Sequence, residues 1–321
     1  MKLLISLVFI SLNLQAQNHF SDQKLYYFIS KDSLLGVKNY QGKIIIPAIS
    51  YNFSDRKNGQ LITDKLIYLL PFKKANSEPH SWGIVYDRTG KELFAPFFFD
   101  NGPDDLNEGM MRFVENKKVG FVDRIGKKVI EAKYDFVSSF DYGIASFCNG
   151  CEWVYEDEHA YVRGGVWGYI NKNGEELPVT KQRKSLNDQV VDSTSFLPYQ
   201  FSYNSFERRI LDSFNRLSII SKIHFINYFS PLDSNERILH YEIVEKPSDF
   251  YPWYHIKGFE FANGEGYKSD PFGSDFFVTR DGKKYLAEDY YKKIPLKTWI
   301  KINEAEAKKY LKNNPGALYK F

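Results

Sequence analysis

The chain has two cysteines, Cys148 and Cys151, and their spacing is typical of three kinds of chemistry. A C-x-x-C pair can be a thiol–disulfide redox site, half of a zinc site, or a structural disulfide. A redox pair usually opens a helix, whereas strand-forming residues flank this one, and only His159 lies nearby as a further zinc ligand. Asn149-Gly150 between the cysteines is a strong hairpin-turn signal. We therefore predict a structural disulfide across or beside a turn, and no metal site.

An acidic cluster follows the cysteines, and we interpret it as a solvated loop, with a cation site as the alternative; its members are Glu152, Glu156, Asp157 and Glu158. Catalytic motifs are missing: the sequence has no G-x-S-x-G, no H-E-x-x-H and no P-loop. The six histidines are scattered. His224, His240 and His255 fall in the C-terminal part and could converge, but we expect each to have a backbone partner instead. No cofactor is predicted.

The most suggestive binding stretch is aromatic, and it comprises Phe250, Tyr251, Pro252, Trp253 and Tyr254. A cluster of rings stiffened by proline can stack on sugar rings or on peptide side chains. The competing interpretation is the start of a strand whose aromatic residues are core.

The order of residues from Val119 to Phe147 predicts a β-hairpin unit. Alternating residues lead from Gly120 into a turn at Gly126, and a second apolar run follows. A turn glycine supplies the positive φ that tight hairpins need. Similar units are led by Gly36, Gly83 and Gly168, so that the leading glycines stand 37 to 48 residues apart. Spacing in this range indicates repeats that stack, because one hairpin buries too little apolar surface to be stable.

Several positions recur among the units. In those led by Gly36, Gly83 and Gly168 a proline follows the second strand and is expected to end it or to lie at an edge. The unit led by Gly83 has one extra residue, which we place in its turn. The dipeptides Trp82-Gly83 and Trp167-Gly168, with the Gly-Lys or Gly-Glu turns and the later Tyr/Phe-Asp and Glu-Gly pairs, make residues 35–179 resemble bacterial WG-repeat proteins. The resemblance implies an all-β repeat array used as an interaction surface, without catalytic residues. Leu35 and Val119 depart from it, because tryptophan would be expected there.

The N-terminus predicts the compartment. Met1-Lys2, an apolar run from Leu3 to Leu12 and a small residue at Ala16 form the pattern of a secretory signal peptide cleaved before Gln17. The apolar run is too short to span a membrane. We therefore expect a periplasmic or secreted protein with no transmembrane segment after cleavage.

Composition and periodicity divide the rest of the chain. Hydrophobic residues make up 43% and aromatic residues 17%, which is typical of a β-rich globular protein, and the net charge of +3 gives no reason to expect nucleic acid. Polar residues from Lys181 to Ser195 suggest a boundary. An apolar period of three to four residues from Phe206 to Ile220 then predicts a helix, capped by Asn204 with Glu207. A short helix capped by Asn303 is expected at the C-terminus.

These observations predict a mainly β protein: a signal peptide (1–16), an array of stacked β-hairpin repeats of the WG type (17–184) and a smaller α+β C-terminal domain (185–321). The hairpin Phe276–Tyr285 is either a degenerate further repeat or a chance similarity. We expect a non-catalytic interaction protein that binds a protein or an envelope glycan through the repeat surface. The alternative is an envelope hydrolase whose site, with Asp249, His255 or nearby carboxylates, lies in the C-terminal domain.

Overall fold

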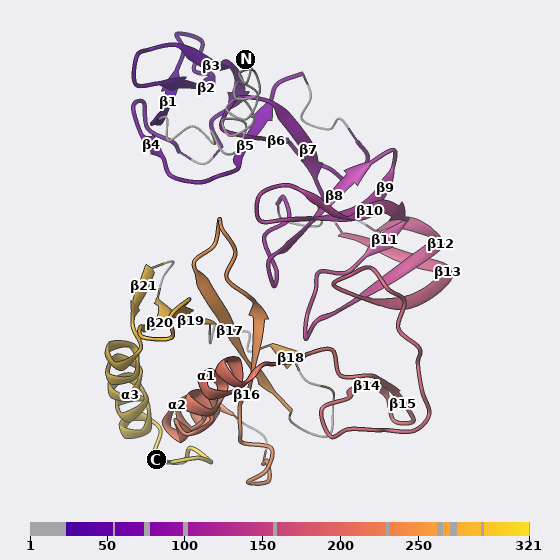
Figure 1. Cartoon of the computed structure of the whole chain (residues 1–321), viewed down its shortest axis with the longest axis vertical. Coiled ribbons are helices and arrows are strands. Elements are labelled where there is room, and N and C mark those ends of the chain that lie inside the picture. Colours follow the sequence, from indigo (N-terminus) through magenta and orange to yellow (C-terminus); the bar gives the residue numbers. More distant parts are fainter. Residues whose placement is uncertain are drawn as a thin grey trace, which may run out of the picture. The chain divides into compact units, whose positions relative to one another are not determined.

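The computed structural model describes residues 24–53, 55–73, 78–98, 102–156, 159–228, 231–261, 266, 268–269, 275–289 and 292–320. The predicted signal peptide and its cleavage position lie outside these residues. Across the described ranges, no helix combines the length and the apolar character that crossing a membrane requires. The protein is mainly β, its sheets are antiparallel, and its C-terminal region is α+β (Figure 1).

The chain forms two compact units. Unit 1 comprises Met1–Asp104, Phe113–Lys117 and Ile125–Lys127, and unit 2 comprises Asp105–Arg112, Lys118–Arg124 and Lys128–Phe321. This division by compactness does not test the boundary predicted between residues 184 and 185, which stays a prediction.

Unit 1 holds an antiparallel sheet with the strand order β7-β6-β5-β3-β2-β1-β4. Its strands are β1 (Leu25–Ile29), β2 (Leu35–Asn39), β3 (Ile44–Tyr51), β4 (Leu61–Ile62), β5 (Ile67–Pro71), β6 (Ile84–Tyr86) and β7 (Glu92–Pro96). Buried aliphatic and tyrosine side chains from these strands, such as Leu25, Val37 and Ile67, form one apolar core. Burial of these side chains is the main force that holds the hairpins together.

The N-terminal half of unit 2 consists of further antiparallel strands. They are β8 (Met110–Glu115, shared with unit 1), β9 (Lys118–Asp123), β10 (Lys128–Tyr134), β11 (Phe136–Val137), β12 (Ile144–Glu156), β13 (His159–Asn171), β14 (Gln189–Asp192) and β15 (Ser195–Leu197). β12 and β13 form a long ribbon, paired from Ile144↔Asn171 to Glu156↔His159 (Figure 1).

In the C-terminal region of unit 2, helices pack on a sheet with the order β16-β17-β19-β20-β21. The elements are α1 (Ser205–Asn215), α2 (Ser218–His224), η1 (Phe225–Asn227), β16 (His240–Glu245), β17 (Trp253–Glu260), β18 (Lys268–Ser269), β19 (Asp275–Thr279), β20 (Tyr285–Asp289), β21 (Lys292–Pro295) and α3 (Leu296–Asn313). Phe214 of α1, Ile256 of β17, Phe276 of β19 and Trp299 of α3 belong to one buried core.

The hairpins led by Gly36, Gly83 and Gly168 share one turn. Asn39, Asp87 and Asn171 each accept, on a side-chain oxygen, the backbone N–H groups of the residues two and four positions later, at 2.8 to 3.1 Å. Each carbonyl also accepts the N–H of the glycine three positions later. Asp123 and Gly126 keep this spacing, and all four turn glycines have φ between 79° and 87°. The positive φ of the turn glycines is as predicted, and the Asx side chains fold the turns locally.

The extra residue of the hairpin led by Gly83 lies in its strand and not in its turn. Asp87 to Gly90 has the same length as the other turns, whereas Gly83 to Asp87 is one residue longer than Gly120 to Asp123. Gly83 absorbs the difference because it alone among the leading glycines has a positive φ, +86°. The prediction for this residue was wrong because the sequence does not show which of two neighbouring segments carries an insertion.

The predicted role of the trailing proline is wrong for Pro47. β3 continues through it to Tyr51, and the pairing of β2 with β3 shifts between Val37↔Ile46 and Leu35↔Ser50. A proline is tolerated at such a bulge because the ladder hydrogen bond is already lost there. Pro96, in contrast, is the last residue of β7.

Asn149-Gly150 is not a hairpin turn, because β12 runs through both residues to Glu156. Asn149 pairs with Val166 and Cys151 pairs with Gly164, and Gly150 and Gly165 between these pairs have φ of 73° and 68°. Both strands are thus distorted at one level of the ribbon. The local sequence signal for a turn is used here for a bulge inside a long strand.

The helices agree with the sequence in part. The capping box of Asn204 and Glu207 is confirmed. The single helix expected over 206–220 is interrupted, because α1 ends at Asn215 and α2 begins at Ser218. The C-terminal helix begins at Leu296 and has 18 residues, so Asn303 lies inside it and donates its side-chain N–H to the Trp299 carbonyl. Burial of Leu296 and Trp299 favours the earlier start.

The hairpin of β19 and β20 resembles the repeats only in part. Gly282 donates to the Thr279 carbonyl as the turn glycines do, but the N–H of Thr279 donates to Lys284, five residues on instead of four. The turn is therefore one residue wider than the shared turn.

We expect Gly120→Val to destabilise the protein by more than about 3 kcal/mol, because a Cβ at Gly120 would lie 2.5 Å from the Ile130 carbonyl oxygen and 2.6 Å from the Ala132 nitrogen. Urea unfolding followed by circular dichroism measures this. Gly102→Val is the control, since a Cβ there meets nothing within 4 Å. Equal midpoints for the two variants would contradict the packing role of Gly120.

Candidate functional site

The predicted binding residues Phe250, Tyr251, Trp253 and Tyr254 do not form one exposed surface. Tyr251 is buried, and the Arg124 guanidinium lies 4.1 Å from its ring centroid. Tyr254 packs against Phe206 of α1 at 5.9 Å. Phe250 and Trp253 are half-buried. Tyr251 therefore stabilises the protein internally, and ligand binding by the stretch stays a prediction for the other three.

Half-buried charges beside Tyr251 link the hairpin turns to β16. Arg124 donates two hydrogen bonds to Glu245, at 2.8 and 2.5 Å. Lys172 donates to the carbonyls of Glu108 and Val244. Side chains from two hairpin turns thus donate hydrogen bonds to consecutive residues of β16, Val244 and Glu245. Partial burial strengthens these charged hydrogen bonds, so this cluster has a structural role.

Glu108 connects two tight turns in the same place. Glu108-Gly109 and Tyr142-Gly143 each have positive φ at both positions, and the Glu108 carboxylate accepts the N–H of Gly143 at 3.0 Å. Burial raises the pKa of Glu108, against the opposing effect of Lys172, and burial lowers the pKa of Lys172, against the opposing effect of Glu108. The Glu-Gly pair at Glu108 is therefore a contact between neighbouring hairpins, and its partner is the Tyr142-Gly143 turn.

Glu242 is the second buried carboxylate of the region. It accepts hydrogen bonds from the hydroxyls of Tyr199, at 2.8 Å, and of Tyr203. Burial raises its pKa to about 7, although both hydroxyls favour the charged form. Tyrosine hydroxyls, and not a cation, satisfy this carboxylate, and the sequence gives no signal for that pairing.

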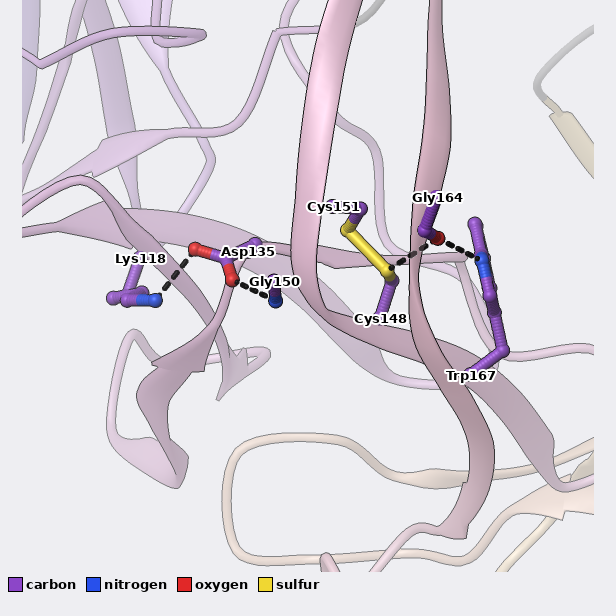
Figure 2. Close-up of a disulfide and its surroundings, with 7 residues drawn as sticks. All are labelled: Lys118, Asp135, Cys148, Gly150, Cys151, Gly164 and Trp167. Carbon is purple, nitrogen blue, oxygen red and sulfur yellow. Dashed lines mark hydrogen bonds and ion pairs between the residues drawn. A yellow bond between two sulfur atoms is a disulfide. The ribbon is translucent and has the colours of Figure 1, made fainter.

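The cysteine pair lies on the β12–β13 ribbon. The Sγ atoms of Cys148 and Cys151 are 2.26 Å apart, so the predicted disulfide is supported. Figure 2 shows that Asp135 holds the distorted strand beside it: its carboxylate accepts from Lys118 at 2.5 Å and from the N–H of Gly150 at 2.7 Å. Burial by itself would raise the pKa of Asp135, but the hydrogen bonds from Lys118 and Gly150 outweigh it and lower the pKa. The pair is part of a fixed ribbon and does not open a helix, as a redox pair would.

Aromatic side chains lie beside the disulfide. Trp167 is 48% exposed, its indole N–H donates to the Gly164 carbonyl at 2.8 Å, and its ring is 5.9 Å from that of Phe136 (Figure 2 shows Trp167 and Gly164). Trp153 also packs against Phe136, with the ring centroids 5.8 Å apart. Trp167 is thus a partly exposed residue of the ribbon.

A larger group of aromatic rings lies at the ends of strands in unit 1. We call it the aromatic row, and it comprises Phe72, Tyr51, Phe53, Trp82 and Phe98 in spatial order. Neighbouring ring centroids are 5.2 to 6.1 Å apart, and their planes are inclined by 54° to 85°. Phe53, Phe72 and Tyr51 are 67%, 61% and 41% exposed. An exposed aromatic patch of this kind is typical of a binding surface.

The sequence analysis singled out Trp82 of the row, as part of a Trp-Gly dipeptide, and missed the other members. The half-buried Trp82 indeed has aromatic neighbours on both sides, and its carbonyl accepts from the Tyr68 hydroxyl at 2.9 Å. The other rings follow strands β3, β5 and β7, which are far apart in the sequence. Only the pairing of those strands brings the rings together.

The histidines of the C-terminal region form separate pairs. His224 lies 2.7 Å from Glu260, and His255 lies 2.5 Å from Asp275, not from the predicted Asp249. The other ring nitrogen of His255, Nδ1, is buried. Burial lowers the pKa of His240. Within the described ranges, no three His, Cys, Asp or Glu residues lie close enough to hold a metal ion.

We expect the free energy of unfolding to fall as the pH rises from about 4.5 to 7, by up to about 3 kcal/mol, because the folded protein holds a proton on Glu242 that the unfolded chain has released. Glu242→Gln should flatten this dependence, measured by urea unfolding between pH 4.5 and 8. Glu306→Gln, which changes an exposed carboxylate on α3, should keep the wild-type slope. An unchanged slope in Glu242→Gln would assign the effect to other groups.

Comparison with known proteins gives one match. Residues 120–153 match the family described as "WG containing repeat". No curated protein and no solved structure matches the chain. The matched segment begins at Gly120, includes the turn at Gly126 and the Tyr142-Gly143 turn, and ends on the disulfide-bearing strand β12. The chain thus contains a WG repeat, at residues 120–153.

Proposed function

We propose that this chain is a non-catalytic interaction protein that binds another protein through the aromatic row of its hairpin units. The observation that carries the proposal is the exposure of Phe53, Phe72 and Tyr51, which form one continuous group with Trp82 and Phe98. Exposed aromatic side chains provide most of the binding energy in many protein interfaces. Contacts between the rings limit their freedom before binding, which reduces the entropy lost on association.

Ring geometry favours a protein over an envelope glycan. A sugar ring stacks on the flat face of an aromatic ring, so a glycan-binding platform presents faces in one plane. In the aromatic row, three of the four neighbouring pairs are inclined by 73° to 85°. Such rings present edges and faces in turn, which suits interdigitation with protein side chains.

Three further parts of the proposal concern architecture and compartment. The hairpins led by Gly36, Gly83, Gly120 and Gly168 are repeats of one stacked array, which the shared Asx turn supports.

The protein is periplasmic or secreted, with cleavage after Ala16. The disulfide-distance pair of Cys148 and Cys151 supports this, because disulfides persist in oxidising compartments. Mass spectrometry of the exported protein should find Gln17 as its first residue.

The alternative is an envelope hydrolase with its site in residues 185–321. The pair of His255 and Asp275 is the observation in its favour, because a carboxylate can orient a histidine base. Nε2 of His255 is engaged by Asp275 and Nδ1 is buried, so neither nitrogen is placed to meet a substrate. Release of soluble fragments from envelope material by the purified protein, lost in His255→Gln, would restore this alternative.

We expect the double variant Phe53→Ser/Phe72→Ser to lose at least about 30-fold in affinity for the partner, the effect of removing interface hot spots. The mature chain and its variants serve as baits for envelope extract, and the recovered partner is then titrated by biolayer interferometry. The control is Tyr40→Ser/Ile44→Ser, which removes two exposed apolar side chains of the same unit.

Equal binding by both double variants would exclude the aromatic row as the surface. Retained material that resists protease and is degraded by a glycan hydrolase would replace the protein partner with a glycan.

A further inference from the structure

A cavity of about 580 Å³ lies in the C-terminal region of unit 2, away from the aromatic row's strands in the sequence. It is bordered by the end of α1, by α2, by the segment before β16 and by the C-terminal tail (Figure 1 shows these elements). Its lining residues are Phe214, Asn215, Leu217, Ser218, Ser221, Lys222, Phe225, Ser234, Arg237, Ile238, Leu239, His240, Tyr241, Tyr319 and Lys320. This volume is in the range of sites for small organic molecules.

The lining combines positive charge with an apolar wall. Lys222, Arg237 and Lys320 are cationic, and no carboxylate belongs to the lining. Phe214 and Phe225 are fully buried and form part of the wall. Burial lowers the pKa of His240, so its imidazole is neutral at pH 7 and offers hydrogen bonds but no charge. A pocket lined in this way attracts an anion with an apolar body.

Arg237 gives the sharpest indication of a ligand. The Arg237 guanidinium lies 4.8 Å from the Tyr319 ring centroid. The Tyr319 hydroxyl accepts the N–H of Leu232, and this hydrogen bond holds the ring against Arg237. The Nε of Arg237 is buried and has no hydrogen-bond partner in the described part of the chain. A buried donor without an acceptor is costly, and a bound carboxylate would satisfy it.

We propose that this cavity binds a small organic anion with one carboxylate or sulfonate group and an apolar body. Arg237 and Lys222 hold the anionic group, and Phe214, Phe225 and Tyr319 contact the body. Ser221 contributes to the wall only, because its hydroxyl already accepts the N–H of Leu239 at 3.1 Å. This site is independent of the proposed protein interface.

Two fluorescent probes test the proposal, 8-anilinonaphthalene-1-sulfonate and its uncharged counterpart N-phenyl-1-naphthylamine. They share their apolar body, so their difference isolates the anionic group. We expect the mature chain to bind the sulfonate at least about tenfold more tightly. Arg237→Gln should remove this preference and leave binding of the uncharged probe unchanged.

Arg208→Gln is the matched control, because Arg208 is an exposed arginine of α1 outside the lining. It should bind both probes as the wild type does. Equal affinity of the wild type for the two probes, or equal sulfonate binding by Arg237→Gln and Arg208→Gln, would overturn the proposal. If Arg237→Gln fails to fold, as thermal unfolding will show, Lys222→Gln replaces it with the same expected loss of preference.

Discussion

Close contact between a leading glycine and the backbone of the neighbouring strand is the constraint on which the hairpins depend. A Cβ at Gly120 would meet backbone atoms of Ile130 and Ala132, and a Cβ at Gly36 would meet the nitrogen of Ala48. In both hairpins the second strand is irregular at this level, and the pairing register shifts. A bulge that bends one strand toward the other needs an empty position opposite it, and glycine provides that position. The residue pattern of the unit follows from this requirement.

Charged side chains that are wholly or partly buried then fix the hairpins of unit 2 to β16. Lys172 donates a hydrogen bond to the Val244 carbonyl, and Arg124 donates to the Glu245 carboxylate. The Glu108 carboxylate accepts the N–H of Gly143 in the neighbouring turn. Each contact uses a residue from a tight turn, where the backbone is least able to pack apolar side chains. Polar groups in such places must find partners within the protein, since unpaired burial is costly. The cluster therefore determines the arrangement of these turns more than it adds to stability.

The sequence predicted the features that depend on local chemistry. The positive φ of the turn glycine Gly126 and the capping box at Asn204 need only neighbouring residues, and both are present. Features that depend on distant partners were missed or misplaced. Asn149-Gly150 lies in a strand because β13 pairs along its whole length, and α3 begins before Asn303 because Trp299 is buried in the C-terminal core. The aromatic row needs three strand pairings to form, so no local pattern could identify it.

The residues that could do acid–base chemistry have partners within the protein, in contrast to the exposed aromatic residues. Glu108 and Glu242 are buried, His255 is half-buried, and each already has a hydrogen-bond partner within the protein. A general acid or base must instead reach a substrate, at least through one water molecule. Aromatic rings show the opposite pattern, because Phe53 and Phe72 both pack against Tyr51 and still remain largely exposed. Apolar burial is therefore the interaction that this surface offers.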